Sequence, residues 1–128
     1  MQLTERDMER LIGVHTELVL LVRACAVRPP ILFTVLEGLR TEERQAELVA
    51  SGASQTMNSR HLTGHAVDLA PIDPSTKEVT WEWDYYYILE PHIKEMATAL
   101  YVNVNWGGDW TSFKDGPHWE LNWDEYPA

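Results

Sequence analysis

Three side chains of this sequence have residue types and an order that suit a metal site: His61, Asp68 and His118. A catalytic zinc ion takes three protein ligands that offer nitrogen, sulfur or oxygen, and it keeps a fourth position open. His61 and Asp68 are separated by a turn at Gly64, which leads into an expected strand. Such a turn can bring an imidazole on a loop beside a carboxylate on a strand. His118 completes the site if its own strand lies adjacent.

Spacing alone leaves alternatives open. His65 follows His61 at a distance that suits a metal on a helix, but Gly64 and the strand-like alternation after it argue against a helix there. Asp68 is equally compatible with the cap of a loop. The single cysteine, Cys25, lies in an apolar stretch, so we expect a small buried side chain rather than a reactive thiol or a metal ligand.

Asp115, Glu120 and Arg40 are further candidates for chemistry. Asp115 lies just before His118, but the Gly116–Pro117 pair follows it and the local sequence favours a turn former. Glu120 shares a face of the expected last strand with His118, which makes it a competing base or a hydrogen-bond partner of that histidine. Arg40 lies between an expected strand and helix, where functional side chains are common, or it forms a surface ion pair.

The hydrophobic pattern predicts the elements that position these side chains. Apolar residues at near-helical spacing, behind a Thr4/Asp7 capping pair, predict one helix over residues 5–26, which Pro29 and Pro30 end. The remaining pattern predicts strands at 31–36, 65–69, 102–106 and 118–121, and polar or irregular loops at 53–64, 71–80 and 109–117. It also predicts two further helices. One spans 42–50, capped by Thr41 and closed by Gly52, and the other starts at about residue 85, with a kink or new start at Pro91.

These elements predict an α+β domain with a small, mostly antiparallel sheet packed with helices, and we expect residues 1–128 to form one domain. The net charge of −10 argues against a nucleic-acid partner and against binding an anionic polymer through bulk charge. The apolar stretches are far shorter than the ~20 residues of a membrane span, and the N-terminus has no signal-like segment. We therefore expect a monomer made in a cytoplasm, without membrane insertion.

Two runs carry a resemblance to a known family. The run Ser59–Asp68 (SRHLTGHAVD) resembles the SxHxxGxAxD signature of the LAS-type zinc peptidases. The run Trp106–Leu121 (WGGDWTSFKDGPHWEL) is similar to the second signature of their L-alanyl-D-glutamate peptidase branch, which includes phage endolysins, and Gly38–Thr41 is similar to a family element before a helix. The resemblance covers most of residues 36–121. It implies the hedgehog/D,D-peptidase-like fold of that family.

The resemblance also implies roles for individual residues. It implies that His61, Asp68 and His118 hold Zn²⁺ and that Asp115 is the catalytic carboxylate. Asp115 would take a proton from the attacking water and return it to the leaving amine. Arg40 is implied as a contact of the substrate or transition state, while Ser59 would orient a ligand or bind substrate. Most of the six tryptophans suit core packing or the rim of a groove, and Trp110 and Phe113 lie nearest the expected site as substrate contacts.

The function implied is a zinc-dependent endopeptidase that hydrolyses the L-alanyl-D-glutamate bond of peptidoglycan stem peptides. Such an enzyme would be a phage endolysin that reaches the host cell wall after release by a holin, and it would suit a thin Gram-negative wall. Three alternatives remain. The same zinc chemistry serves D,D-carboxypeptidases and dipeptidases; the chain could be a non-catalytic zinc-binding recognition module; or Glu120 or His65 could close a structural zinc site as fourth ligand.

Overall fold

Four antiparallel strands form the sheet at the centre of the protein, in the order β1-β2-β4-β3. The computed structural model describes residues 1–127. Along the chain the elements are α1 (Glu5–Arg10), α2 (Thr16–Cys25), β1 (Phe33–Glu37), α3 (Glu42–Ala50), the 3-10 helix η1 (Arg60–Thr63), β2 (Ala66–Pro71), α4 (Trp83–Leu100), β3 (Val104–Trp106), the 3-10 helix η2 (Gly107–Asp109) and β4 (His118–Leu121). The predicted α+β class with a small antiparallel sheet is confirmed.

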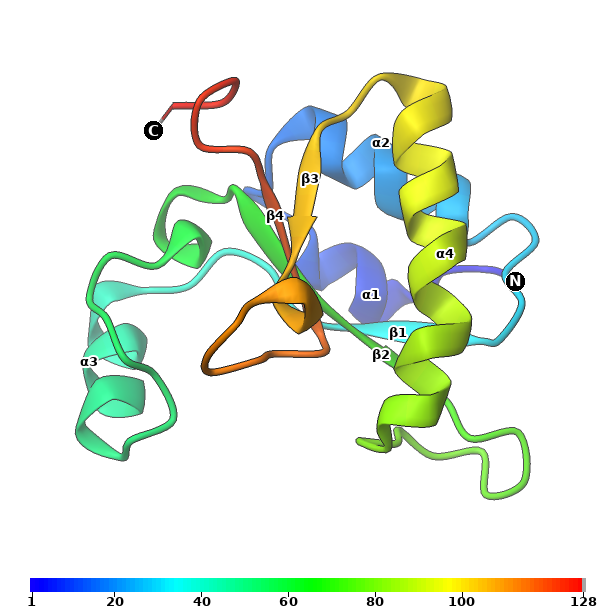
Figure 1. The fold of residues 1–128 in the computed structure, drawn as a ribbon, viewed down its shortest axis with the longest axis horizontal. Helices are drawn as coiled ribbons and strands as arrows, with labels where there is room; N and C mark the ends of the chain where they lie inside the picture. Colours follow the sequence, from blue (N-terminus) through cyan, green and yellow to red (C-terminus); the bar gives the residue numbers. More distant parts are fainter. Residues whose placement is uncertain (128) are drawn as a thin grey trace.

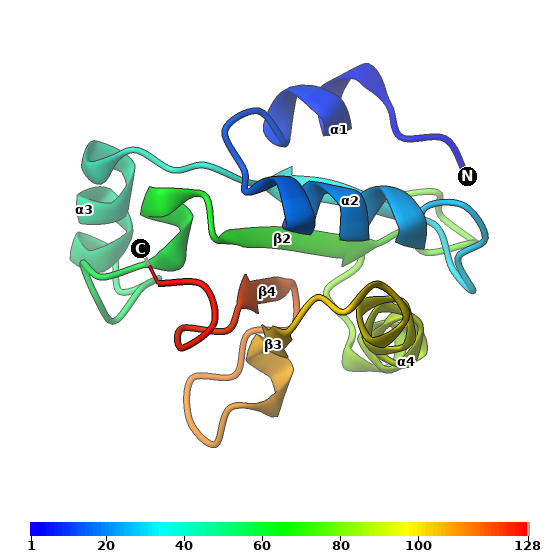
Figure 2. The ribbon, with the colours of Figure 1, turned by 90° about the horizontal axis from the view of Figure 1, so that it is seen from above.

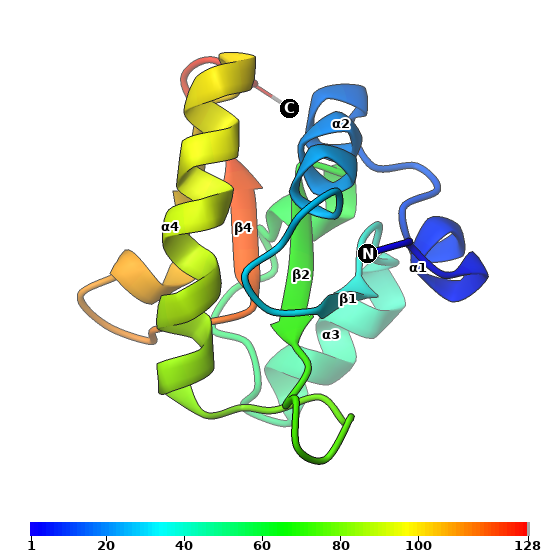
Figure 3. The ribbon, with the colours of Figure 1, turned by 90° about the vertical axis from the view of Figure 1, so that its right-hand side faces the viewer.

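One face of the sheet is covered by α2 and α4, which pack against each other (Figures 1 and 3). Because side chains alternate along a strand, every second residue of β2 and β4 points to this face. These residues are Val67, Leu69, Trp119 and Leu121, and all are buried in the core. Their partners on the helices include Leu18, Leu21, Val22, Leu89 and Ile93. Each such burial stabilises the fold by about 1.5–3 kcal/mol, so this layer fixes which face each strand turns outward.

The opposite face of the sheet carries polar side chains. Asp68 on β2 and His118 and Glu120 on β4 lie on this face, opposite to the apolar residues of the same strands. It is flanked by α3 and the 51–59 segment on one side and by the 107–117 segment on the other (Figures 1 and 2). The sheet therefore separates an apolar core from a polar cavity.

The predicted single helix over residues 5–26 is wrong, because the chain turns between α1 and α2. Gly13 has a φ of +84°, a left-handed conformation that a continuous helix does not contain. His15 then caps the N-terminus of α2, where its Nδ1 accepts the backbone N–H of Glu17 at 3.1 Å. Leu11 and Val14 in the turn are buried as well. The apolar spacing therefore runs through the turn without a visible break.

The other predicted elements lie close to the observed ones. The helix at 42–50 and the strand at 118–121 have the predicted bounds, and Thr41 caps the helix by accepting the N–H of Arg44. The predicted loop at 53–64 contains η1. The last helix is one element with Pro91 inside it, so no new helix starts there. Within residues 1–127, no helix combines the length and apolarity that a membrane crossing needs.

Asp7 joins the first helix to the edge of the sheet. Its Oδ1 accepts hydrogen bonds from the Thr34 hydroxyl at 2.6 Å and from the Val35 amide at 2.9 Å, and its Oδ2 accepts the Thr4 amide at 2.9 Å. Burial raises the pKa of the Asp7 carboxyl, but these hydrogen bonds outweigh burial and hold the pKa below its ordinary value. The buried carboxylate thus anchors α1 to β1.

We expect Asp7→Asn to lower the free energy of unfolding at neutral pH by about 2 kcal/mol, because the amide cannot accept all three bonds. Since the folded pKa lies below the ordinary value of 3.8, the stabilisation is present above that pH and is lost as the pH falls through the folded pKa. Urea unfolding at pH 7 and pH 3 measures both effects. Glu9→Gln, an exposed site on the same helix, is the control. Equal loss in both variants would contradict the role of Asp7.

Candidate metal centre

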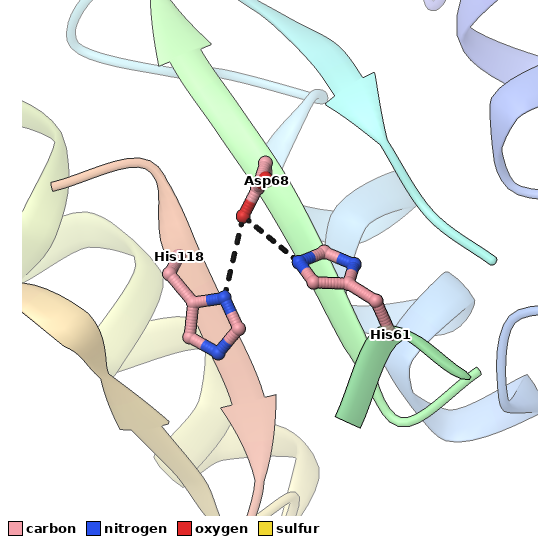
Figure 4. Close-up of side chains that lie close together, drawn as sticks. All are labelled: His61, Asp68 and His118. Carbon is pink, nitrogen blue, oxygen red and sulfur yellow. Dashed lines mark hydrogen bonds and ion pairs between the residues drawn. The ribbon is translucent and has the colours of Figure 1, made fainter. Parts of the chain in front are cut away.

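The ligand atoms of His61, Asp68 and His118 converge on one point (Figure 4). They all lie within 4.8 Å of one another. Asp68 Oδ1 is 3.1 Å from His61 Nε2 and 3.3 Å from His118 Nδ1. Among the residues that the structure describes, this is the only such group of three His, Cys, Asp or Glu side chains. Tertiary structure thus brings together the three residues that the sequence singles out as ligands.

Strand pairing and one tight turn position these three side chains. Asp68 on β2 is directly opposite His118 on β4, and residues opposite one another have Cβ atoms about 4.5–5.5 Å apart. His61 lies in η1, and Gly64 returns the chain from η1 to β2 with a φ of +76°. A Cβ at Gly64 would lie 2.3 Å from the carbonyl oxygen of Gly13. Both the backbone angle and this close approach therefore require glycine.

Hydrogen bonds at the far side of each ring settle the histidine tautomers. His61 Nδ1 lies 2.8 Å from the carbonyl oxygen of Gly38, and His118 Nε2 lies 2.7 Å from Glu120 Oε1. A carbonyl and a carboxylate only accept, so both of these ring nitrogens carry the proton. In neutral rings the lone pairs are then on His61 Nε2 and His118 Nδ1, the two atoms that face Asp68. This arrangement is typical of metal-binding histidines with oriented outer partners.

The electrostatics of the site favour positive charge at this point. Burial raises the pKa of Asp68, but the hydrogen bonds and charges of His118 and His61 outweigh burial and hold it well below its ordinary value. Burial lowers the pKa of His118, while its hydrogen bonds to Asp68 and Glu120 raise it to about 9. Protonated rings donate to Asp68, and a metal that displaces these protons would meet the lone pairs of the same two nitrogens and the carboxylate oxygen.

The donor set and its spacing fit a divalent metal of the zinc type. Two nitrogens and one oxygen match a catalytic zinc site with three protein ligands. Zinc bonds of about 2.0–2.1 Å in tetrahedral directions separate neighbouring ligand atoms by roughly 3.3 Å. The separations of 3.1 and 3.3 Å around Asp68 Oδ1 are close to that value. The two separations that involve Asp68 therefore fit such an ion, and all three ligand atoms lie within 4.8 Å of one another.

The three residues lie in a cavity of about 680 Å³. Its lining includes every site residue predicted from the sequence: Arg40, Ser59, His61, Asp68, Trp110, Phe113, Asp115 and His118. The volume is in the range of cavities that bind small ligands or peptide segments. Residues from both flanking segments, 52–59 and 110–115, form its walls.

Asp115 lies in the 107–117 segment, where its backbone forms a turn. Its N–H donates to the Gly107 carbonyl at 3.0 Å, and its own carbonyl accepts the N–H of His118 at 3.3 Å. The carboxyl group lines the cavity and is partly buried. Burial raises its pKa, the charge of Asp68 raises it further, and His118, His61 and Arg40 counteract them only in part. Asp115 therefore forms the turn and also faces the cavity.

Arg40 belongs to a partly buried polar network beside Asp68. Its Nε and Nη2 donate to the two oxygens of Glu37 at 2.8 Å, and its Nη1 donates to Gln45 Oε1 at 2.8 Å. Its Nη2 is also 3.7 Å from Asp68 Oδ2. Gln45 is fully buried and donates to the Thr56 carbonyl at 2.6 Å, which ties the network to the cavity wall. Sequence reasoning missed Glu37 and Gln45, since no local signal distinguishes them from other polar residues.

The three proposed substrate contacts differ in their surroundings. Ser59 caps η1, and its hydroxyl accepts the N–H of His61 at 3.2 Å. The ring of Trp110 lies beside His118, with ring centroids 5.1 Å apart. Phe113 is 70% exposed at the tip of the 107–117 segment, with a φ of +52°. Ser59 is therefore engaged in local structure, whereas the two aromatic rings offer surface to a ligand.

Comparison with known proteins identifies relatives. The family described as phage L-alanyl-D-glutamate peptidase matches residues 1–122. The chain is 41% identical over 92 residues to the L-alanyl-D-glutamate peptidase of Listeria phage A118, which is 72% of this chain and 31% of that protein. This chain thus spans about a third of the length of that relative.

Solved structures that resemble this fold include the following two. The crystal structure of the Serratia marcescens L-Ala D-Glu endopeptidase ChiX has a TM-score of 0.91 and 44% sequence identity, covering 100% of this chain and 95% of that one. The vancomycin resistance D,D-pentapeptidase VanY, solved in complex with Zn(II), has a TM-score of 0.55 and 15% identity over 84% of this chain and 72% of that one. The second likeness is one of fold alone.

We expect zinc to stabilise the protein through the three ligands. At a free concentration 100 times the dissociation constant, the gain in unfolding free energy is about 2.7 kcal/mol. His118→Ala should abolish this gain, because two ligands remain. His65→Ala is the control, since His65 lies outside the group and its Nδ1 contacts the Thr63 hydroxyl. Urea unfolding with and without zinc measures the effect, and an undiminished gain in His118→Ala would count against the site.

Proposed function

The chain belongs to the phage L-alanyl-D-glutamate peptidase family, and from this we propose that it hydrolyses the bond between L-alanine and D-glutamate in the stem peptides of peptidoglycan. The metal is zinc, and His61, Asp68 and His118 are its ligands. One observation carries the proposal: the three ligand atoms converge in a single cavity whose lining also includes Asp115 and Arg40. A metal with three protein ligands, a carboxyl group and a cationic side chain suffices for peptide hydrolysis.

Each resident group has a distinct task. Bound zinc supplies a Lewis acid that polarises a carbonyl group and lowers the pKa of water towards ~7. Asp115 removes the proton from the attacking water and delivers it to the amine of the leaving D-glutamate. The raised pKa of Asp115 suits this exchange, because a carboxyl group with a raised pKa holds a proton more readily near neutral pH. The two oxygens of one carboxylate serve both transfers in turn.

Arg40 supplies positive charge where negative charge develops. Three of its five N–H groups are used by Glu37 and Gln45, so two remain for the oxygen of the scissile carbonyl. The salt bridge to Glu37 holds the guanidinium in one orientation before substrate arrives. Such preorganised donors stabilise a transition state more than a mobile side chain does.

The walls of the cavity recognise the peptide. Trp110 and Phe113 offer aromatic surface to the stem peptide, and Ser59 holds His61 in place through its N–H. Lys114, an exposed residue of the cavity lining, provides positive charge for an acidic substrate in a protein whose net charge is −10. The substrate is therefore recognised locally, against the overall charge of the protein.

The relatives support a proposal for the biological setting. We propose that the protein is an endolysin, which acts as a monomer of one domain on the host cell wall after release from the cytoplasm by a holin. A relative from a phage supports this setting. The likeness to a D,D-pentapeptidase concerns the fold alone, so D,D-carboxypeptidase specificity is treated as an outcome of the experiment below.

Asp115→Asn should lower the rate of hydrolysis by about 10²–10⁴-fold, because the amide cannot take a proton from water. Zinc content should stay unchanged, since Asp115 is not a ligand. The assay digests purified peptidoglycan and identifies the fragments by mass spectrometry, in which new N-terminal D-glutamate is required. Glu95→Gln, an exposed site on α4, is the control. Release of D-alanine alone would overturn the endopeptidase assignment, and full activity in Asp115→Asn would overturn the role of that residue.

Arg40→Lys should lower kcat by about 10²-fold, because an ammonium group cannot keep the bidentate pair with Glu37 and still reach the substrate oxygen. Arg44→Lys is matched to it, since Arg44 lies in the following helix and its pair with Glu47 is exposed. The measurement is the initial rate at saturating peptide with zinc in excess. Equal rates in the two variants would show that the Arg40 guanidinium is dispensable.

A further inference from the structure

A chain of hydrogen bonds runs outward from His118 to the surface of the protein. His118 Nε2 donates to Glu120 Oε1 at 2.7 Å, and the indole Nε1 of Trp123 donates to Glu120 Oε2, also at 2.7 Å. His118 and Glu120 are buried, whereas Trp123 is 44% exposed and lines the cavity. Both oxygens of one carboxylate are therefore held, one by the histidine and one by the tryptophan.

Trp123 is itself held by Arg60. The guanidinium Cζ of Arg60 lies 4.3 Å from the centroid of the Trp123 ring, a cation–π contact. Arg60 is only 2% exposed, and its Nη2 donates to the Tyr126 carbonyl at 2.7 Å. The turn at 122–126, which carries Trp123, is thus tied to the residue that directly precedes His61. The indole has a fixed place from which it can hold Glu120.

We propose that Trp123 is a positioning residue of the metal centre: its indole N–H, acting through Glu120, sets the orientation of the His118 ring. The proposal rests on the zinc site proposed above. The direction of a histidine lone pair depends on the hydrogen bond made by the other ring nitrogen. In this protein His118 Nε2 bonds to the Glu120 carboxylate, and the indole N–H of Trp123 prevents that carboxylate from rotating.

Arg60 is the reason that Glu120 needs the Trp123 N–H as a second donor. Trp123 contacts both groups: its indole N–H donates to Glu120 Oε2, and its ring centroid lies 4.3 Å from the Arg60 guanidinium Cζ. The Nε and Nη1 of Arg60 are buried and have no hydrogen-bond partner among residues 1–127. We expect a Glu120 carboxylate that Trp123 no longer holds to be drawn toward this buried positive charge. That movement would take Oε1 away from His118.

Trp123→Phe tests the proposal, because phenylalanine keeps an aromatic ring over Arg60 and lacks the N–H. We expect the dissociation constant for zinc to rise by about 10-fold, the lower end of the range for outer partners of metal ligands. Competition with a chromophoric chelator measures it, and urea unfolding of the metal-free protein measures stability separately. Trp81→Phe, at a side chain that is 65% exposed, is the matched control. Unchanged zinc affinity in Trp123→Phe would overturn the proposal, even if stability falls.

A double variant shows whether Trp123 acts through Glu120. Glu120→Gln replaces one of the two accepting oxygens with an NH2 group, which cannot accept from His118 or Trp123, and should weaken zinc binding by about 10–100-fold. Adding Trp123→Phe to Glu120→Gln should then cause no further loss of zinc affinity, because the hydrogen-bond chain from Trp123 through Glu120 to His118 is already broken. Full additivity of the two losses would mean that Trp123 acts independently, and the proposal would be wrong.

A measurement on the unsubstituted protein covers the case in which Trp123→Phe does not fold. Addition of zinc should shift the Nε1–H resonance of Trp123 in a ¹⁵N correlation spectrum and leave that of Trp81 in place. A Trp123 resonance that does not respond to bound zinc would contradict the coupling. If the unsubstituted protein binds no zinc at all, the proposed function fails instead, so the two failures can be told apart.

Discussion

The antiparallel pairing of β2 with β4 is the constraint on which the rest of the structure depends. It sets Asp68 opposite His118 on one face, and Val67 opposite Trp119 on the other. A slip of one residue in either strand would exchange these faces. Val67 and Trp119 are buried against the helices, and a slip would expose them to water. The stabilisation lost with their burial therefore prevents the slip. The hydrophobic core thus holds the polar site in register.

Three carboxyl groups of the cavity have different pKa values because their surroundings differ. The pKa of Asp68 and that of Glu120 are held low, because both carboxylates have histidine partners that outweigh their burial. The pKa of Asp115 is raised by burial and by the charge of Asp68. Carboxyl groups close together in the same fold are therefore suited to the different tasks proposed for them, as ligand, as hydrogen-bond acceptor and as base. Arg40 balances Glu37 and Asp68 at once.

The scaffold of sheet and helices differs from the segments that form the cavity walls. The sheet and its helices recur in VanY at 15% identity, so the scaffold tolerates wide change in sequence. The cavity walls come from the 52–59 and 110–115 segments, which connect elements of that scaffold. Connecting segments vary more easily than the elements they join, which makes them the natural place for substrate specificity. The positions of the three proposed ligands belong instead to η1, β2 and β4.

Local sequence determined much of this protein by itself. Alternation along 65–69 and 118–121 predicted which residues face the same way, Thr41 and Gly52 predicted the bounds of α3, and the two family signatures singled out the residues that now line one cavity. Local pattern did not reveal the turn at Gly13, because the buried residues of that turn continue the helical spacing. It also did not reveal Glu37, Gln45 or Trp123 as partners of the site. Their roles depend on hydrogen bonds to residues placed by other segments of the fold, and only tertiary packing decides such contacts.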